Sequence, residues 1–198
     1  MKVRDLLAAE SINLHGAAEN KKDALDQMVK LMAASGKIAD VETYRRGVYA
    51  REEESTTGIG EGIAIPHCKS DAVKAAGLSA MVLKDGVDFD ALDGQKVHLI
   101  FLIAAPNTKD NVHLDVLSRL SVLLMDESFT KSLRSAKTPE EFLNVIDAAE
   151  EKKAGGETKD SKEPAAARKR ILAVTGCPTG IAHTYMAAES LEKKAAEL

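Results

Sequence analysis

Apolar residues recur three or four positions apart in several stretches of the chain, which is the spacing of an amphipathic helix. In the first stretch, Asn20 is placed to cap the helix N-terminus and Ser35-Gly36 to end it. Thr138-Pro139-Glu140-Glu141 has the order of another helix start, with Thr at the N-cap and Pro at the first position. The predicted helices cover residues 20–34, 41–51, 111–125 and 127–136, followed by a helix that begins at Pro139.

Short, continuous apolar runs between these helices predict strands at residues 63–65 and 77–83. The run from Val97 to Ala105 is nearly all apolar, as is typical of a central strand covered on both faces. Asp85-Gly86 has the composition of a hairpin turn. Because strands and helices interleave, residues 1–148 are expected to form one α/β domain with a mixed β-sheet flanked by helices.

A glycine-rich stretch, Thr56-Thr57-Gly58-Ile59-Gly60-Glu61-Gly62, leads into the first of these strands and on to Pro66-His67. Glycines at alternate positions let the backbone turn tightly and let another molecule approach it closely. Pro66 cannot donate to a strand ladder, so we expect it to end the strand or lie at its edge. His67 is then expected on a stiff turn at the tip of a core strand. An imidazole there can do chemistry near its ordinary pKa of about 6.5, or only make a hydrogen bond.

The composition changes near residue 149. Residues 150–170 contain no aliphatic side chain larger than alanine, so this segment cannot bury enough apolar surface to order itself. We therefore expect a flexible linker over residues 149–170. Beyond it, the pattern predicts a strand at 171–175, a loop at 176–182 and then a helix. One strand and one helix cannot bury a core, so residues 171–198 are expected to begin a second α/β domain.

Composition and charge narrow the possible partners. Aromatic residues make up only 4% of the 198 residues, tryptophan is absent, and the formal net charge is −4. These values argue against nucleic-acid binding, which uses stacking aromatics and a positive face. An acidic surface suits a basic protein partner. The apolar runs are too short for a membrane span, and the two cysteines, Cys68 and Cys177, form no Cys-x-x-Cys pair. We expect a cytoplasmic chain with reduced thiols and no direct insertion into the membrane.

Cys177 opens a loop between a predicted strand and the N-terminus of a predicted helix, where loop N–H groups favour an anion. The spacing is that of the tyrosine-phosphatase loop, Cys-x5-Arg-Ser/Thr, but His183-Thr184 stands where that pattern has Arg-Ser/Thr. Without a bidentate guanidinium, hydrolysis of a phosphorylated cysteine is expected to be slow, so the phosphoryl group would persist for transfer. An inert buried thiol is the alternative.

The two reactive segments resemble parts of one system. Gly60-Glu61-Gly62-Ile63-Ala64-Ile65-Pro66-His67 resembles the active-site signature of the fructose/mannitol-type enzyme IIA of the bacterial phosphoenolpyruvate:sugar phosphotransferase system. Cys177-Pro178-Thr179-Gly180-Ile181-Ala182-His183-Thr184 resembles the phosphocysteine loop of the fructose-type enzyme IIB. The IIA resemblance covers about residues 1–148, and the IIB resemblance covers only the end of the chain.

The resemblance implies a phosphoryl relay from phosphoenolpyruvate through enzyme I and the phosphocarrier HPr to His67, then to Cys177, and finally to a sugar in a membrane IIC unit. It implies that His67 carries the phosphoryl group on Nε2, and that His113 and Arg51 are active-site residues. A histidine at a helix start and a permanent cation would both steady the phosphoryl charge. The implied phosphate or partner loops consist of Thr57, Gly58, Gly60, Glu61, Pro178, Thr179, Gly180, Ile181, Ala182, His183 and Thr184.

No cofactor or metal ion is expected. The chain has no Gly-x4-Gly-Lys-Ser/Thr loop and no Asp-rich cluster. A phosphoramidate nitrogen is already a good leaving group, so the protein mainly positions the reactants and screens charge. The implied partners are HPr or a similar phosphocarrier and the IIB and IIC domains of the same transporter. The linker would keep the IIA donor near the IIB acceptor at an effective concentration of about 1 mM.

Three alternatives stay open. A IIA-like domain can act as a regulatory phosphorylation switch, as in nitrogen-type relatives, although such a domain needs no acceptor like Cys177. The sugar can be mannitol or mannosyl-glycerate in place of fructose, because sugar specificity belongs to IIC. A zinc ion held by His67, Cys68 and His113 is the least favoured, because adjacent side chains would have to converge and no fourth ligand suggests itself.

Overall fold

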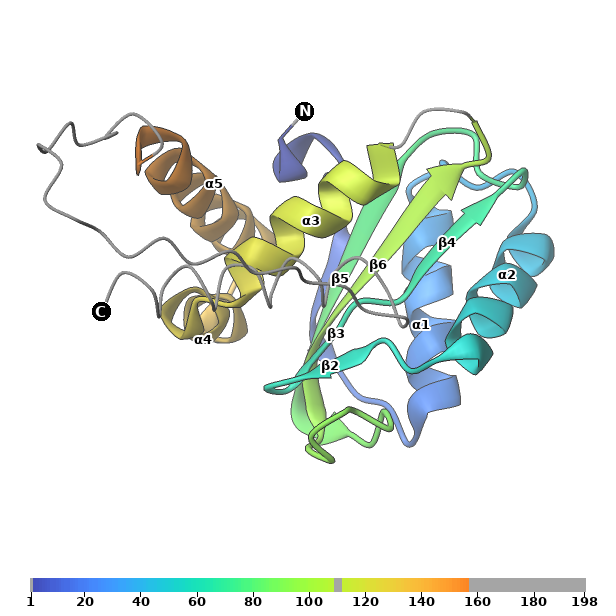
Figure 1. The fold of residues 1–198 in the computed structure, drawn as a ribbon, viewed down its shortest axis with the longest axis horizontal. Coiled ribbons are helices and arrows are strands. Elements are labelled where there is room, and N and C mark those ends of the chain that lie inside the picture. Colours follow the sequence, from blue (N-terminus) through green and yellow to red (C-terminus); the bar gives the residue numbers. More distant parts are fainter. Residues whose placement is uncertain (1, 109–111, 157–198) are drawn as a thin grey trace, which may run out of the picture.

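A mixed β-sheet separates two layers of helices in the computed structural model, which describes residues 2–108 and 112–156 (Figure 1). One face of the sheet is covered by α1 (Lys21–Ala34) and α2 (Val41–Glu54). The other face is covered by α3 (Val112–Leu124), α4 (Glu127–Ser135) and α5 (Pro139–Gly156), with a short 3-10 helix, η1 (Val3–Asp5), before the first strand. This is the α/β class with a flanked mixed sheet that the sequence predicts.

The sheet has the strand order β1-β5-β6-β3-β2, and β4 also pairs with β6. The strands are β1 (Leu7–Gly16), β2 (Gly58–Gly60), β3 (Ile63–Ala64), β4 (His67–Ser70), β5 (Gly77–Val87) and β6 (Val97–Pro106). The β5–β6 and β2–β3 pairs are antiparallel, whereas β1–β5, β3–β6 and β4–β6 are parallel. β6 therefore lies at the centre of the sheet, as its apolar run predicts.

Two hydrophobic cores fill the two faces of the sheet. Along β5, Leu78 and Ala80 belong to the core beneath α3, α4 and α5, whereas Met81 and Leu83 belong to the core beneath α1 and α2. Successive side chains of a strand point to opposite faces, so a strand with a core on each side reads as a continuous apolar run. This explains why the β5 and β6 sequences show no alternation of polar and apolar residues.

The prediction of a hairpin turn at Asp85-Gly86 is wrong. β5 continues to Val87, and Gly86, with a φ of 65°, lies in an irregular stretch between the pairs Val82–Leu99 and Val87–Val97. The dipeptide therefore forms a bulge inside the strand, and the chain returns to β6 over residues 88–96. Both a turn and a bulge use a residue with positive φ, so the local sequence does not distinguish them.

The predicted starts of the first two helices are confirmed. The Asn20 side chain accepts the N–H of Asp23 at 3.0 Å, and the Asp40 side chain accepts the N–H of Thr43 at 3.1 Å. Two helices run further than predicted, α2 to Glu54 and α5 to Gly156. The predicted linker at 149–170 is therefore helical over its first part, where Glu150 accepts the backbone N–H of Val3 at 3.1 Å.

The remainder of the predicted linker and the predicted second domain, residues 157–198, lie outside the described residues. Within the part of the chain that the structure describes, no helix is both long enough and apolar enough to cross a membrane.

Candidate active site

His67 is the first residue of β4, whereas the sequence predicts it on a stiff turn at the tip of a core strand. β3 and β4 lie along β6 in one register, with Ala64 opposite Ile100 and His67 opposite Ile103. Between them, the Pro66 carbonyl accepts the N–H of Ile103 at 3.0 Å. Proline removes one donor but keeps its acceptor, so the strand is interrupted without losing its register.

His67 and Cys68 point to opposite faces of the sheet. Cys68 is buried in the core beneath α1 and α2, against Gly47 of α2, where an added Cβ would lie 2.6 Å from its Sγ. Burial raises the pKa of the Cys68 thiol to about 11, so the thiol is protonated at neutral pH. The strand partner of His67, Ile103, belongs to the opposite core. Because the two neighbouring side chains diverge, they do not fit the shared zinc site considered above.

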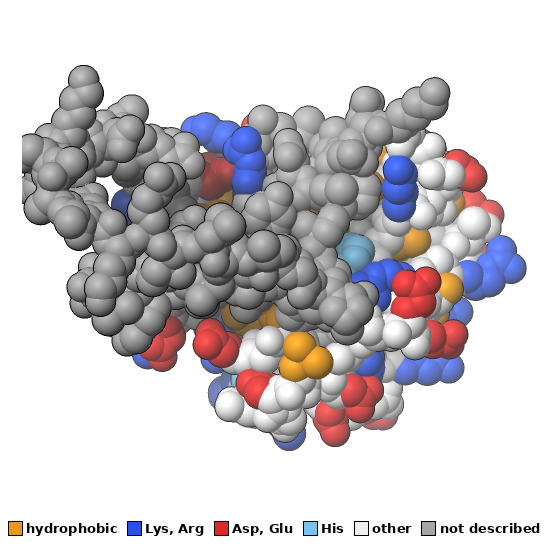
Figure 2. All heavy atoms as spheres, viewed as in Figure 1, with side chains coloured by type: hydrophobic (Ala, Val, Ile, Leu, Met, Phe, Trp, Pro, Cys, Tyr) orange, Lys and Arg blue, Asp and Glu red, His pale blue; other side chains and the backbone are white. Residues whose placement is uncertain are grey.

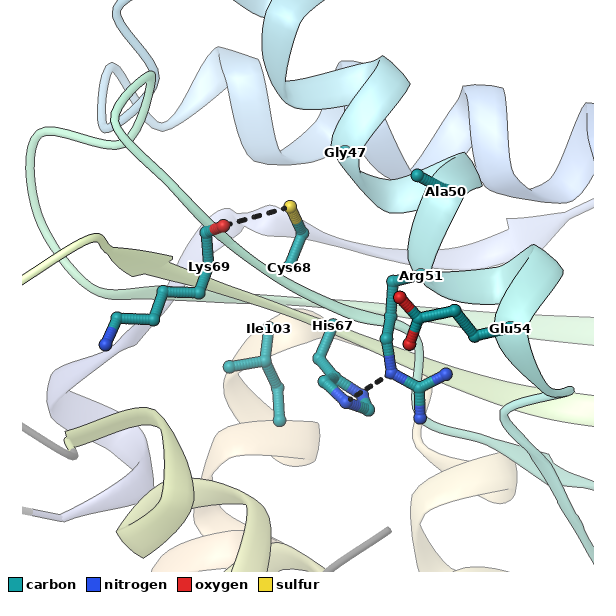
Figure 3. A pocket seen from close by; sticks show the side chains of 8 residues that line it. All are labelled: Gly47, Ala50, Arg51, Glu54, His67, Cys68, Lys69 and Ile103. Atoms are coloured by element: carbon teal, nitrogen blue, oxygen red, sulfur yellow. Dashed lines mark hydrogen bonds between the residues drawn. The ribbon is translucent and has the colours of Figure 1, made fainter. Parts of the chain in front are cut away.

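Each ring nitrogen of His67 has a hydrogen-bond partner that can act in only one way, as a donor or as an acceptor. Nδ1 lies 3.0 Å from the carbonyl oxygen of Ile65, and Nε of Arg51 donates to Nε2 at 3.1 Å (Figure 3). A carbonyl oxygen can only accept a hydrogen bond and a guanidinium can only donate one. Nδ1 therefore carries the proton and Nε2 carries the lone pair, so the nitrogen predicted to receive the phosphoryl group is the nucleophilic one.

Arg51 lies in the last turn of α2, and the structure brings it to His67 as predicted. Its Nη1 donates to the carbonyl oxygen and to the hydroxyl of Ser55, each at 3.2 Å. These two hydrogen bonds fix one edge of the planar guanidinium and leave Nε directed at the imidazole. Sequence reasoning missed Ser55, whose only local signal is its place directly after the helix.

An open pocket of about 290 Å³ lies beside His67 (Figure 3). The small residues Gly47 and Ala50 of α2 are among its lining residues. Two of its charged lining residues, Glu54 and Lys69, were also missed from the sequence. The sequence signal for them is their spacing from Arg51 and His67, because residues three apart on a helix and two apart on a strand share a face. The lining residues are Gly47, Ala50, Arg51, Glu54, His67, Cys68, Lys69 and Ile103.

The glycine-rich turn is a hairpin tip between β2 and β3. Gly60, Glu61 and Gly62 all have positive φ, at 101°, 53° and 74°. The N–H of Glu61 donates to Asp93 at 2.8 Å, and its carbonyl accepts from Arg134 of α4 at 2.9 Å. Five steps along the extended chain, from Gly62 to His67, span roughly 16 Å. The structure therefore does not bring Gly60 and Glu61, which were predicted as phosphate- or partner-loop residues, to the imidazole, and their predicted role toward a partner stays a prediction.

Thr57 and Gly58, also predicted as loop residues, are packed into the structure. Thr57 is only 4% exposed, and its N–H and hydroxyl both donate to the buried carboxylate of Glu52. Gly58 lies against the loop before β6, where an added Cβ would be 2.9 Å from the Cα of Ala91. The donors of Thr57 are thus already used within the protein.

The remaining predicted site residues are not placed. His113 lies in the first turn of α3, on the face of the sheet that carries Ile103, but its side chain is outside the described part of the chain. Cys177 and the loop at residues 178–184 also lie outside the described residues.

The visible surface of the described residues carries interspersed acidic and basic side chains (Figure 2). Such mixing differs from the one-signed positive face that nucleic-acid binding requires. Among the described residues that line the pocket beside His67, the charged ones are Arg51, Glu54 and Lys69.

Two family models match the chain, one over each predicted segment. Residues 5–149 match the model described as phosphoenolpyruvate-dependent sugar phosphotransferase system, EIIA 2. Residues 172–198 match the model described as PTS system, Lactose/Cellobiose specific IIB subunit. The second match confirms a IIB start, although its description names another sugar class than the fructose-type IIB of the sequence resemblance.

Known proteins match the same segments. The whole chain is 44% identical to part of the PTS system fructose-specific EIIABC component of Bacillus subtilis (strain 168), of which it covers 31%. The chain thus spans about a third of the length of the EIIABC relatives that it matches.

Solved structures match the first segment. The Nitrogen Regulatory Protein IIA-Ntr from Neisseria meningitidis is 29% identical with a TM-score of 0.68, and the match covers 73% of this chain and 98% of that one. The complex of enzyme IIAMTL and phosphorylated enzyme IIBMTL from Escherichia coli gives 28% identity and a TM-score of 0.64, over 72% of this chain and 99% of that one. This chain belongs to the EIIA type 2 family of the phosphoenolpyruvate-dependent sugar phosphotransferase system, with the start of a IIB domain behind it.

Proposed function

We propose that this chain is a phosphoryl carrier of a sugar phosphotransferase system. Nε2 of His67 takes the phosphoryl group from the phosphohistidine of HPr or a similar phosphocarrier and passes it to Cys177 of the IIB segment. The observation that supports this most directly is the lone pair on Nε2, held 3.1 Å from the Nε of Arg51. The family match over residues 5–149 supports the same chemistry.

In the first step, the Nε2 lone pair attacks the phosphorus of the donor's phosphohistidine. A new N–P bond forms while the donor's N–P bond breaks, and the donor imidazole keeps that electron pair. The Nε–H of Arg51 gives up its bond to Nε2 at this point. Its guanidinium then donates to the phosphoryl oxygens, whose negative charge it balances.

The Ile65 carbonyl acts on the same ring from the other side. With Nε2 phosphorylated and Nδ1 still protonated, the imidazole ring is cationic, and the carbonyl 3.0 Å from Nδ1 stabilises that proton. In the second step, the thiolate of Cys177 attacks the phosphorus, and His67 leaves as a neutral imidazole with its proton on Nδ1. A positively charged ring is the better leaving group, so this hydrogen bond favours onward transfer.

The wider relay is part of the proposal. Residues 1–148 form the IIA domain, the segment up to residue 170 connects it to the IIB segment at 171–198, and His113 is the second active-site histidine. The sugar is fructose, because the Bacillus subtilis relative, 44% identical over the whole chain, is named fructose-specific. The domain works in the cytoplasm, docked on the membrane IIC unit of the transporter.

Intact-mass measurement tests the first step. The protein is incubated with phosphoenolpyruvate, enzyme I and HPr, and wild type is compared with His67→Ala and Cys177→Ser. We expect one acid-labile phosphoryl adduct, on His67, in Cys177→Ser, up to two adducts in wild type, where Cys177 can also hold a phosphoryl group, and none in His67→Ala. An unmodified wild-type chain, or an adduct that survives in His67→Ala, would overturn the proposal.

A further inference from the structure

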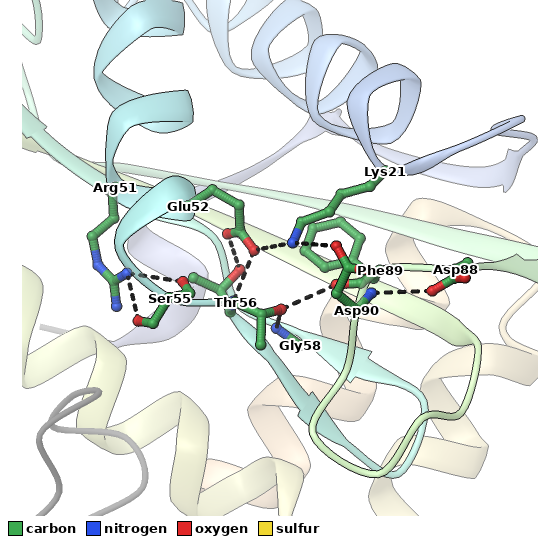
Figure 4. A network of polar contacts seen from close by, with 10 residues as sticks. Lys21, Arg51, Glu52, Ser55, Thr56, Gly58, Asp88, Phe89 and Asp90 are labelled. Atoms are coloured by element: carbon green, nitrogen blue, oxygen red, sulfur yellow. Dashed lines mark hydrogen bonds and ion pairs between the residues drawn. The ribbon is translucent and has the colours of Figure 1, made fainter.

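A buried carboxylate lies directly beside Arg51 in the sequence, outside the residues given a role in the transfer. Glu52 is only 7% exposed, and one of its oxygens accepts the N–H of Thr57 at 2.9 Å while the other accepts the Thr57 hydroxyl. Nζ of Lys21, at the start of α1, lies 2.9 Å from the same carboxylate (Figure 4). A buried charge is stable only when it is paired and hydrogen-bonded, and Glu52 meets both conditions.

Three segments meet at this carboxylate. Lys21 also contacts Asp90 at 3.2 Å and lies 5.1 Å above the centre of the Phe89 ring. The Thr56 hydroxyl donates to the Phe89 carbonyl at 3.0 Å (Figure 4). The start of α1, the end of α2 and the loop after β5 are therefore tied together around the turn that leads from α2 into β2.

The same turn holds the arginine of the candidate active site. Ser55 begins it and supplies both oxygens that bind Nη1 of Arg51, and Thr57, two residues on, is held by Glu52. Figure 4 shows Arg51 and Glu52 reaching this turn from the same helix end. A turn that shifted would carry the Ser55 oxygens with it, and the guanidinium would rotate away from Nε2 of His67.

We infer that Glu52 is a positioning residue for phosphoryl transfer: it fixes the Ser55–Thr57 turn, which sets the guanidinium of Arg51 against Nε2 of His67. This rests on the proposed role of His67 as the phosphoryl acceptor. Glu52 acts through Thr57, Ser55 and Arg51. The competing explanation is that the Glu52–Lys21–Thr57 contacts serve only the stability of the fold.

The first test measures the rate of phosphoryl transfer from phospho-HPr to wild type, Glu52→Ala and Glu53→Gln. Glu53 is the exposed neighbour on the same helix and serves as the matched control. Because a misplacement of about 1 Å can cost up to about 100-fold in rate, we expect Glu52→Ala to lose about tenfold in maximal rate at saturating phospho-HPr. The half-saturating concentration should change little, and Glu53→Gln should stay within about twofold of wild type.

A double-mutant cycle separates positioning from stability. If Glu52 acts through Arg51, adding Glu52→Ala to Arg51→Ala lowers the rate by less than about twofold. A full tenfold loss in the Arg51→Ala background would overturn the inference, since Glu52 would then act by another route. If Glu52→Ala does not fold, Thr57→Val removes only the hydroxyl bond, and it should lose about threefold in rate by the same route. A wild-type rate in Thr57→Val and in Glu52→Gln together would also overturn it.

The ¹⁵N NMR signals of the His67 imidazole provide a readout that needs no phosphorylation. Removing the Arg51 hydrogen bond shifts the Nε2 signal, so Glu52→Ala should move this signal toward its position in Arg51→Ala, while Glu53→Gln leaves it unchanged. A shifted signal in a protein that HPr never phosphorylates would contradict the proposed function alone. An unchanged signal with wild-type transfer would contradict the positioning role alone.

Discussion

The two ends of the stretch from Gly60 to His67 serve different purposes within one signature. At the Gly60 end, backbone groups with positive φ form a hairpin tip that Asp93 and Arg134 hold by hydrogen bonds. At the His67 end, Arg51 and Ile65 decide which ring nitrogen is nucleophilic. The Gly60 end fixes the backbone conformation of the hairpin, and the His67 end carries the reactive imidazole.

The hairpin still matters for the chemistry, through the register of the strands. The carbonyl of Gly62 accepts the N–H groups of His98 at 2.8 Å and Leu99 at 3.0 Å, which ties the tip to the start of β6. From there β3 and β4 follow β6 in one register up to His67. A slip by one residue would turn His67 to the other face of the sheet. Signature glycines can thus place a reactive residue without touching it, and substitutions at the two ends should have separable effects.

The largest effect is expected for Arg51→Ala, at the His67 end. Loss of a preorganised donor to developing charge typically lowers a rate by about 100- to 1,000-fold, and we expect a loss in this range for phosphoryl transfer to His67. The melting temperature should change little. Arg51→Lys should recover only a small part, because an ammonium cannot bond Ser55 and the imidazole in one plane. A rate within a fewfold of wild type, measured by rapid quench, would contradict the role of Arg51.

The next effect concerns stability, at the Gly60 end. In Gly62→Ala the new Cβ meets a φ of 74° and lies 2.6 Å from Nη2 of Arg134. Gly36→Ala is the matched control, because its φ is 72° and nothing lies within 4 Å of the new Cβ. We expect Gly36→Ala to lower the unfolding free energy by about 1 kcal/mol and Gly62→Ala by about 2 kcal/mol.

Chemical denaturation measures both values, and the phosphorylation rate per folded molecule should stay near that of wild type. Equal losses of unfolding free energy in the two variants would show that the Arg134 side chain moves away from the new Cβ at no energetic cost. A large loss of transfer rate in folded Gly62→Ala would remove the distinction between the two ends.

The smallest effect is expected for Asp93→Asn. The N–H groups of Gln95 and then Glu61 donate to Asp93 and hold the pKa of its carboxyl below the ordinary value of 3.8. A carboxyl whose pKa is lower in the folded state stabilises the fold above its unfolded pKa, and this stabilisation is lost as the pH falls from about 3.8 through the folded value. Thermal unfolding of wild type and Asp93→Asn should therefore differ slightly at neutral pH and converge in acid. A gap that stays constant down to pH values below both pKa values would contradict this account.

Several elements could be predicted because their causes are local. Asn20 and Asp40 begin helices by accepting N–H groups three residues away, and the apolar run of β6 reflects its own burial. The errors came where distant partners decide. Gly86 makes a bulge because β6 pairs with β5 on both sides of it, and α5 continues past residue 149, where Glu150 binds the N–H of Val3.

For the site, the sequence alone determined the residue types and, by resemblance, the pairing of His67 with Arg51. It did not indicate that the backbone N–H and carbonyl of Glu61 would bind Asp93 and Arg134. It also did not indicate that Ser55 and Glu52 would support the arginine. Only the tertiary structure placed the proton on Nδ1 and the lone pair on Nε2. The physical reason is that a histidine tautomer follows from what faces each nitrogen, and here the carbonyl of Ile65, between β3 and β4, faces one nitrogen and the end of a helix faces the other.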